Sequence, residues 1–433
     1  MKKIVYLIVF FTSIILFSCT PQEDDLFDES SSSRIDAALK SHQEVLKSAE
    51  NGWLMEYFPA AGQVYGGYNL LASFTDDEAK FAGEIALATE NETGMYSLKQ
   101  SAGPVLTFDT YNEIFHFFSN PNSDISGVGK NGVGMGGDFE FLVIKATPDS
   151  IILKGKKTEN KIVMTPLAKG VVWSDFIDNI NDAAEEMAFR KFEYQVNGLS
   201  ITATVNYRTL NFTYTDEAGN EVKESASYIQ TLTGYKLYKP LNIGGVEVKE
   251  FIYNSDTDSF TAKDNADVKL VPVIPPLTEV FVNGDWFFKF SGLGSLGKLY
   301  WNDVKVNGLD PIGQELYYGF MGTDGGGIDD YAFHFYTSQN SIPIKYGLYT
   351  FDYVIMGDNQ IGFTFTGSTN ADGLWYFNNA RFGNLLYPLR IAESFTLSTD
   401  NNVNPSWIKF IDDEDPDNTI ILYPTPVEFP YKN

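Results

Sequence analysis

Short segments in which apolar and polar residues alternate recur along this chain from position 53 almost to its end. They include 53–58, 68–74, 80–87, 95–99, 105–108, 139–145 and 151–154, and the series continues after position 200. Gly, Pro, Asn and Asp separate these segments. Successive side chains of a β-strand point to opposite faces of a sheet, so a period of two predicts strands. The sequence therefore predicts a mainly β protein whose antiparallel sheets form sandwich or barrel-like domains.

Two segments change to a period of three to four residues and predict short amphipathic helices at 34–50 and 173–189. In the first, Ile35, Leu39 and Leu46 share one face, Ser33 is the expected cap, and Asn51-Gly52 ends the helix. We predict no other long helix. Three less regular segments, 114–118, 298–301 and 385–391, are predicted as strands.

Composition limits the classes of protein that this chain can belong to. Hydrophobic residues make up 43% of it, which is ample for a packed core and excludes global disorder. Asp and Glu number 57 against 31 Lys and Arg, a net charge of -26, so we expect no nucleic-acid partner. Cys19 is the only cysteine, which excludes disulfides, Cys-ligated zinc and thiol catalysis in the body of the protein.

The first 18 residues have the features of a secretory leader. Lys2 and Lys3 precede a mostly apolar run that ends at Phe17, and Ser18-Cys19 follows. The run is too short to span a bilayer as a helix. The end of the leader resembles a bacterial lipobox, in which the cysteine becomes the first mature residue and is acylated. The segment 1–18 is therefore predicted to be a lipoprotein signal peptide, with Cys19 as the lipid attachment site and the membrane as a partner.

Residues 19–33 are predicted to form a flexible tether. The segment is acidic and rich in serine, so it has little apolar area to bury. An acidic cluster just after the lipid-bearing cysteine resembles the signal that exports lipoproteins to the outer face of the outer membrane in Bacteroidota. The expected location is the outer membrane, facing the cell exterior, and the alternative is a plain linker on a protein that faces the periplasm.

The adjacent prolines Pro275 and Pro276 favour a stiff, extended connection and predict a domain boundary. The predicted parts are an N-terminal β-rich region, 34–275, which contains both helices, and a C-terminal β-rich domain, 276–433. Weak internal echoes also occur, such as Asn51-Gly52-Trp53 and Asn283-Gly284-Asp285-Trp286. They raise duplicated modules as a hypothesis, with similar turn chemistry as the alternative.

Aromatic residues next to turn residues are the candidate ligand-binding positions. Tyrosine and tryptophan on loops present an apolar face beside a polar rim, which suits stacking on sugar rings. The alternative for each is that it fills a β core. The candidates are Tyr65, Tyr68, Tyr317, Tyr318, Trp375 and Tyr376.

No catalytic residues are predicted, because the sequence contains neither Gly-x-Ser-x-Gly nor His-Glu-x-x-His. The oxygen-rich group Asp324, Asp329 and Asp330 is a candidate metal site. It would suit Ca²⁺, with a solvated acidic turn as the alternative. No cofactor is otherwise expected.

Several motifs resemble an uncharacterised family of Bacteroidota surface lipoproteins, catalogued as a domain of unknown function. They are the helix from Arg34 to Ala49, Asn51-Gly52-Trp53, Tyr57-Phe58-Pro59, Gly66-Gly67-Tyr68-Asn69, Gly137-Asp138-Phe139-Glu140-Phe141 and Asp149 to Lys157. Members of this family are often encoded beside a TonB-dependent transporter and its starch-utilisation-type lipoprotein. The resemblance implies these two partners and a role in nutrient capture, and it implies no catalytic residues.

We therefore expect an outer-membrane-anchored surface lipoprotein that is an accessory, ligand-capturing component of a nutrient import system. Its ligand would be a glycan or a peptide. The alternatives are a surface hydrolase of glycans or peptides, and a structural or adhesive lipoprotein.

Overall fold

The structure is a computed structural model that describes residues 31–101, 103–122, 128–216, 218–323 and 331–426. The described residues form two compact units. The first comprises the described residues up to Asp182, together with Tyr207–Thr209 and Ser227–Leu232. The second comprises Ala183–Asn206, Leu210–Ala226 and the described residues from Thr233 onward.

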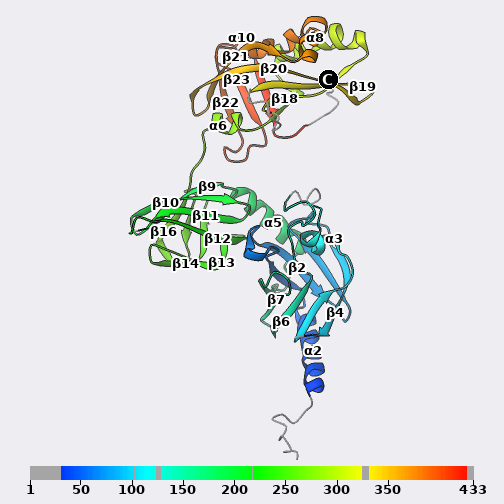
Figure 1. Ribbon diagram of the computed structural model, residues 1–433, viewed down its shortest axis with the longest axis vertical. Helices are drawn as coiled ribbons and strands as arrows, with labels where there is room; N and C mark the ends of the chain where they lie inside the picture. The colour runs from blue at the N-terminus through cyan, green and yellow to red at the C-terminus, as the bar shows by residue number, and fades with distance from the viewer. Residues whose placement is uncertain (1–30, 102, 123–127, 217, 324–330, 427–433) are drawn as a thin grey trace, which may run out of the picture. The chain divides into compact units, whose positions relative to one another are not determined.

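The described strands close into three antiparallel barrels, each of the up-and-down type (Figure 1). The first barrel contains β1 (Trp53–Tyr57), β2 (Tyr68–Phe74), β3 (Glu78–Gly83), β4 (Glu92–Gln100), β5 (Pro104–Phe108), β6 (Glu140–Thr147), β7 (Ser150–Gly155) and β8 (Lys161–Pro166). It closes where β1 pairs with β8. The mainly β class is confirmed, in its barrel form.

The second barrel contains β9 (Lys191–Val196), β10 (Leu199–Asn206), β11 (Thr209–Thr215), β12 (Glu221–Thr231), β13 (Gly234–Ile243), β14 (Val246–Asn254), β15 (Ser259–Ala262) and β16 (Asn265–Pro272). It closes where β16 pairs with β9. Both barrels fall within 34–275, the predicted N-terminal region.

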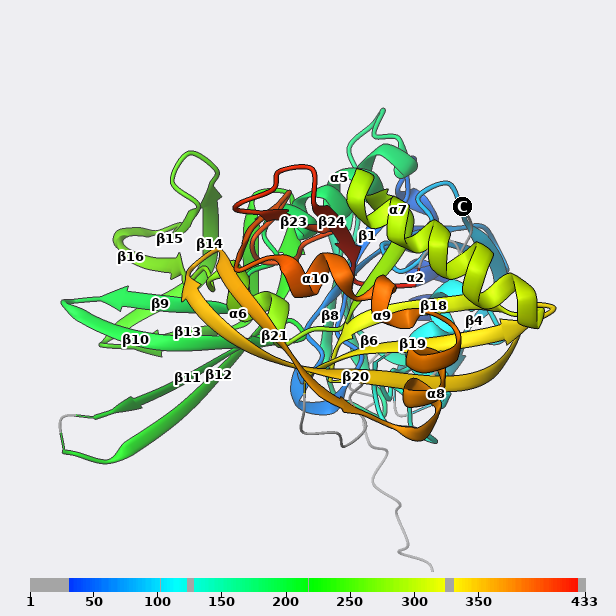
Figure 2. The same cartoon turned by 90° about the horizontal axis from the view of Figure 1, so that it is seen from above.

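The third barrel contains β17 (Trp286–Leu293), β18 (Glu315–Gly322), β19 (Ala332–Gln339), β20 (Ile342–Gly357), β21 (Gln360–Thr369), β22 (Phe395–Thr399), β23 (Ile408–Asp412) and β24 (Thr419–Tyr423). It closes where β17 pairs with β24. Figure 2 shows β20 and β21 as a long hairpin. The proline pair Pro275-Pro276 lies between β16 and helix α6 (Leu277–Val282), which precedes this barrel.

The alternation of apolar and polar residues in the sequence corresponds to side chains that point alternately into and out of the barrels. Along β1, Trp53, Met55 and Tyr57 are buried and the residues between them are partly exposed. β7 and β8 show the same alternation. Removal of these large apolar side chains from water stabilises each barrel.

The two predicted helices exist with different ends. Helix α2 spans Ser31–Ser48, so Ser33 lies inside it and the predicted cap is wrong. Helix α5 spans Trp173–Glu186 and stops three residues before the predicted end. The chain turns there because Met187 and Phe189 are buried against the second barrel, where Tyr235 donates a hydrogen bond to the Met187 carbonyl.

Three predicted strands are wrong, because the chain is helical at these positions. Segment 114–118 forms helix α3 (Glu113–His116) and a 3₁₀ turn, because the Asn112 side chain accepts a hydrogen bond from Phe115 N and caps the helix. Segment 298–301 lies within α7 (Ser295–Val304). Segment 385–391 forms the end of α9 (Phe382–Leu385) and α10 (Tyr387–Ile391), and α8 (Ala371–Asn379) precedes them.

In the first and third barrels alike, a helix precedes the first strand and a tryptophan begins that strand. Trp53 opens β1, and its indole N–H donates to the Leu46 carbonyl of α2 at 2.8 Å. Trp286 opens β17, and its indole N–H donates to the Phe281 carbonyl of α6 at 3.0 Å. The two Asn-Gly echoes in the sequence thus lie at similar places, between a helix and the first strand of a barrel, and duplicated modules stay a hypothesis.

Candidate ligand-binding site

A groove of about 550 Å³ opens in the second unit, beside the third barrel. Three segments distant in the sequence form its walls: the connection before α6, the turn between β20 and β21, and the end of β22 with the loop after it. The lining residues are Ile274, Pro275, Pro276, Leu277, Asp358, Asn359, Leu397, Ser398, Thr399 and Asn402. This volume is within the range of typical small-molecule sites.

Backbone hydrogen bonds fix the three walls to one another. Thr278, which is fully buried at the start of α6, donates through its N–H to the Asp358 carbonyl at 3.0 Å. Its hydroxyl also contacts the Gly357 carbonyl, at 3.1 Å. On the other side of the turn, the N–H of Leu397 donates to the Asn359 carbonyl at 2.7 Å. The groove is therefore formed in advance of any ligand, which reduces the entropy lost on binding.

The Asp400 carboxylate braces the loop that follows β22. It accepts hydrogen bonds from Ser406 N at 3.1 Å and Asn401 N at 3.0 Å, and also from the Ser406 hydroxyl. Burial raises the pKa of the Asp400 carboxyl, but hydrogen bonds from Ser406 and Thr399 outweigh this effect and hold the pKa below its ordinary value of 3.8. The brace is therefore complete above pH 3.8 and is lost as the pH falls through the lowered pKa.

The lining combines apolar and polar side chains. Ile274, Pro275 and Pro276 supply apolar surface, whereas the Asn359 and Asn402 amides supply hydrogen-bond donors and acceptors. Asp358 is the one charged side chain among the ten lining residues, and no Lys, Arg or His is among them. The groove suits a neutral, amphipathic ligand such as a sugar and disfavours an anion.

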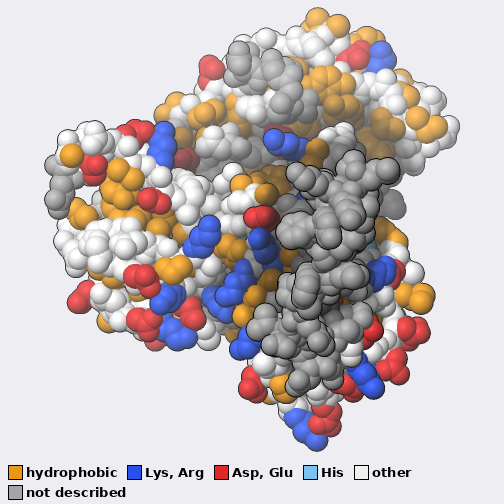
Figure 3. Space-filling model, turned by 60° about the horizontal axis from the view of Figure 1, so that its bottom comes forward, with side chains coloured by type: hydrophobic (Ala, Val, Ile, Leu, Met, Phe, Trp, Pro, Cys, Tyr) orange, Lys and Arg blue, Asp and Glu red, His pale blue; other side chains and the backbone are white. Residues whose placement is uncertain are grey.

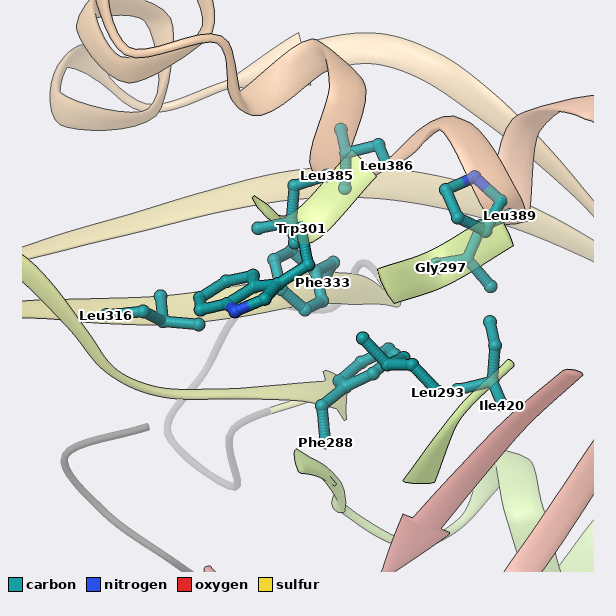
Figure 4. Close-up of a pocket in the computed structure, with 11 residues that line it drawn as sticks. Phe288, Leu293, Gly297, Trp301, Leu316, Phe333, Leu385, Leu386, Leu389 and Ile420 are labelled. Atoms are coloured by element: carbon teal, nitrogen blue, oxygen red, sulfur yellow. The ribbon is translucent and has the colours of Figure 1, made fainter. Parts of the chain in front are cut away.

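A second cavity lies inside the third barrel and is too small for such a ligand. Figure 4 shows Trp301 from α7, Phe333 from β19 and Leu389 from α10 among the side chains around it. Its volume is about 20 Å³, room for about one water molecule, and its lining is apolar. This cavity is a packing gap of the core.

The predicted stacking residues of the third barrel lie in two pairs, one on β18 and one on α8. Tyr317 and Tyr318 on β18 are half-buried, and the Tyr318 ring centroid lies 4.9 Å from that of Tyr336. On α8, Trp375 is exposed, whereas the buried Tyr376 hydroxyl lies 2.8 Å from the Thr337 hydroxyl. None of the four lines the groove.

Tyr65 and Tyr68 lie in the first unit, next to a buried ion pair. Tyr65 meets Tyr207 edge to face, and the Arg208 guanidinium lies 4.6 Å from the Tyr68 ring centroid. Arg208 binds both carboxylate oxygens of Glu84, at 2.7 and 3.0 Å. The nearby Gly66 has φ of +68°, and a Cβ there would lie 2.2 Å from the Arg208 Cβ, so the close approach requires glycine.

The remaining predicted sites are Cys19 and the carboxylates Asp324, Asp329 and Asp330, and they lie outside the described residues. Among the residues that the structure does describe, no three His, Cys, Asp or Glu side chains gather as a metal site requires. No helix in the same part of the chain is both long and apolar enough to cross a membrane.

Sequence reasoning did not find the groove. Its carboxyl and amide side chains come from two turns rich in Asp and Asn, at 358–359 and 400–402, and its hydroxyl groups come from the end of β22. Nothing in one sequence indicates that these two turns meet beside Pro275 and Pro276.

A family model described as a domain of unknown function, DUF4302, matches residues 23–255. No curated protein matches the chain. Among solved structures, the β subunit of DNA polymerase from Streptococcus pyogenes is 10% identical over 90% of this chain and 98% of that chain, with a TM-score of 0.13. The β subunit of DNA polymerase III from Thermotoga maritima is 9% identical over 90% and 97%, with a TM-score of 0.14. Scores this low carry no argument about fold or function.

Proposed function

The chain belongs to the DUF4302 family, and for this member we propose a role as a surface lipoprotein that captures a neutral, sugar-like ligand in the groove beside the third barrel. In this proposal acylated Cys19 holds the protein at the outer membrane, facing the cell exterior. The captured ligand, a glycan or a peptide, is passed to an import system that contains a TonB-dependent transporter and a starch-utilisation-type lipoprotein. The protein itself is an accessory component.

The preformed groove, with its amphipathic lining, is the observation on which this proposal depends. Sugars have apolar C–H faces and hydroxyl rims, and the lining offers proline and isoleucine beside amide and hydroxyl groups. Figure 3 shows both acidic and basic side chains on the face that it draws, among apolar and neutral ones.

The alternative, a glycan hydrolase, gains less support from this groove. Glycosidases of the common kind place two carboxyl groups roughly 5–9.5 Å apart across the scissile bond. Asp358 is the one carboxyl group among the ten lining residues. Capture without cleavage is therefore the proposal that we favour.

Replacing Asn359 and Asn402 together with alanine is expected to weaken ligand binding by roughly 10- to 100-fold. Each lost hydrogen bond contributes about 0.5–1.5 kcal/mol, and 1.4 kcal/mol is about a factor of ten. The wild-type protein is first screened on arrays of neutral oligosaccharides and peptides, and isothermal titration calorimetry then gives the Kd of each variant.

Asn378→Ala is the matched control, because Asn378 is an exposed amide of the same unit outside the groove. It is expected to leave the Kd unchanged. A double variant that binds as tightly as the wild type would place the ligand elsewhere.

Replacing Cys19 with serine is expected to release the protein from the membrane fraction, because no acyl chains would then be attached. Cell fractionation and mass spectrometry of the mature N-terminus measure this loss. Wild-type protein on intact cells is expected to be digested by added proteinase K. Protection of the wild type until the outer membrane is broken would contradict the exterior location.

A further inference from the structure

The outer part of β20 extends beyond the strand that pairs with it. β19 pairs with β20 only as far as Thr350, and the next N–H, that of Phe351, donates to the Tyr331 carbonyl at 2.8 Å. β21 continues to pair on the other side, with Val354 opposite Gly362 and Ile355 opposite Ile361. Among the described residues, no strand lies beside Asp352–Gly357 on the side of β19. Within the described part of the chain this segment is an open sheet edge, at the turn end of the hairpin in Figure 2.

The open edge is apolar and exposed. Tyr353, Val354, Ile355 and Met356 follow one another, and between 40% and 60% of each is exposed. Edge strands are normally protected by lysine, proline or a bulge, because exposed apolar edges pair with other strands. Here the run contains neither lysine nor proline, and its one register irregularity, between Ile355 and Gly357, lies at the turn end. A contiguous run of exposed apolar residues at a sheet edge is a candidate interaction surface.

The backbone of the edge is oriented to pair with another strand. In an antiparallel ladder, alternate residues direct their N–H and C=O groups to the same side. Phe351 N–H points toward β19, so the N–H groups of Tyr353 and Ile355 point to that side too, beyond the end of the pairing. These are the groups that an added strand would bind.

The charges at the two ends of the edge identify its occupant. Asp352 and Asp358 flank the apolar run, and the chain as a whole has a net charge of -26. Antiparallel pairing of two copies centred on Ile355 would set Asp352 opposite Asp358 of the second copy, which places like charges together. A strand with basic ends would instead set opposite charges together.

We propose that the edge Asp352–Gly357 is a docking site for an extended apolar segment of a partner protein, flanked by Lys or Arg, that adds to β20 as an antiparallel strand. Main-chain hydrogen bonds to Tyr353 and Ile355 supply affinity. The apolar side chains and the two terminal aspartates determine which segments fit.

The test uses a fluorescein-labelled peptide, Lys-Val-Thr-Val-Thr-Val-Lys, and fluorescence anisotropy with the full mature chain. Ile355→Pro removes an outward N–H without removing a bond to β21, and it is expected to weaken binding at least tenfold. Ile355→Thr keeps the N–H and the β-branched shape, and it is expected to bind within about threefold of the wild type. Asp352→Lys is expected to weaken this peptide and to strengthen a peptide with Glu at both ends.

Three outcomes would overturn the proposal. One is equal binding, or no binding, of the Lys-ended and Glu-ended peptides. Another is a dimer in sedimentation velocity that Ile355→Pro abolishes, which would make a second copy the occupant. The third is Ile355-dependent sedimentation with phosphatidylglycerol vesicles, which would make a lipid surface the occupant. Circular dichroism of each variant establishes that the loss of binding is not a loss of folding.

Discussion

Replacing Arg208 with alanine is expected to lower the free energy of unfolding of the first unit by about 3–5 kcal/mol. The Glu84 side chain is only 2% exposed, and the substitution would leave its carboxylate buried without its cation. Arg208 also donates to the Gly67 carbonyl at 2.7 Å, so a buried acceptor would lose its donor as well. Hydrogen exchange of the β2 amides, monitored across a urea series, measures this change in the free energy of unfolding of the first unit directly.

Arg381→Ala is the matched control for this prediction. Arg381 also binds both oxygens of one carboxylate, that of Asp303, at 2.9 and 3.0 Å. Its side chain is 53% exposed, and exposed ion pairs contribute about 0–1 kcal/mol. Equal losses for the two variants would show that burial does not determine the strength of the Arg208–Glu84 pair.

Replacing Trp53 with alanine is expected to destabilise the first barrel by about 3–5 kcal/mol. The Trp53 side chain is fully buried at the start of β1, so its removal leaves a cavity in the core. The Leu46 carbonyl of α2 would also lose the indole N–H that it accepts. Hydrogen exchange of the β1 amides across a urea series measures the loss.

Trp53→Phe separates the two contributions, because phenylalanine keeps most of the apolar volume and removes only the N–H. It is expected to cost about 1–3 kcal/mol, the penalty of a buried acceptor without a partner. Trp286→Phe is expected to cost a similar amount in the third barrel. Trp375→Ala, at an exposed position on α8, is the control and is expected to change stability by no more than about 0.5 kcal/mol. A Trp53→Phe variant as stable as the wild type would contradict a stabilising role for the hydrogen bond.

Much of the fold was predictable because strand alternation is a local property. β1, β7, β14 and β23 lie where short runs of apolar and polar residues alternate. The errors share one cause: short apolar runs fit either a strand or a buried helix. Within α7, Gly297, Trp301 and Val304 are buried at helical spacing, but the four residues 298–301 alone do not reveal it.

The sequence by itself determined the mainly β class and the two amphipathic helices, because each depends on residues only a few positions apart. Tertiary structure alone decided that the strands close into barrels, that Arg208 reaches Glu84 and that Asp358 and Asn402 line one groove. Those contacts join residues far apart in the chain. The order of strands around each barrel brings these residues together. The sequence does not reveal the closure of the barrels, because the period of two is the same whether a sheet closes or stays open.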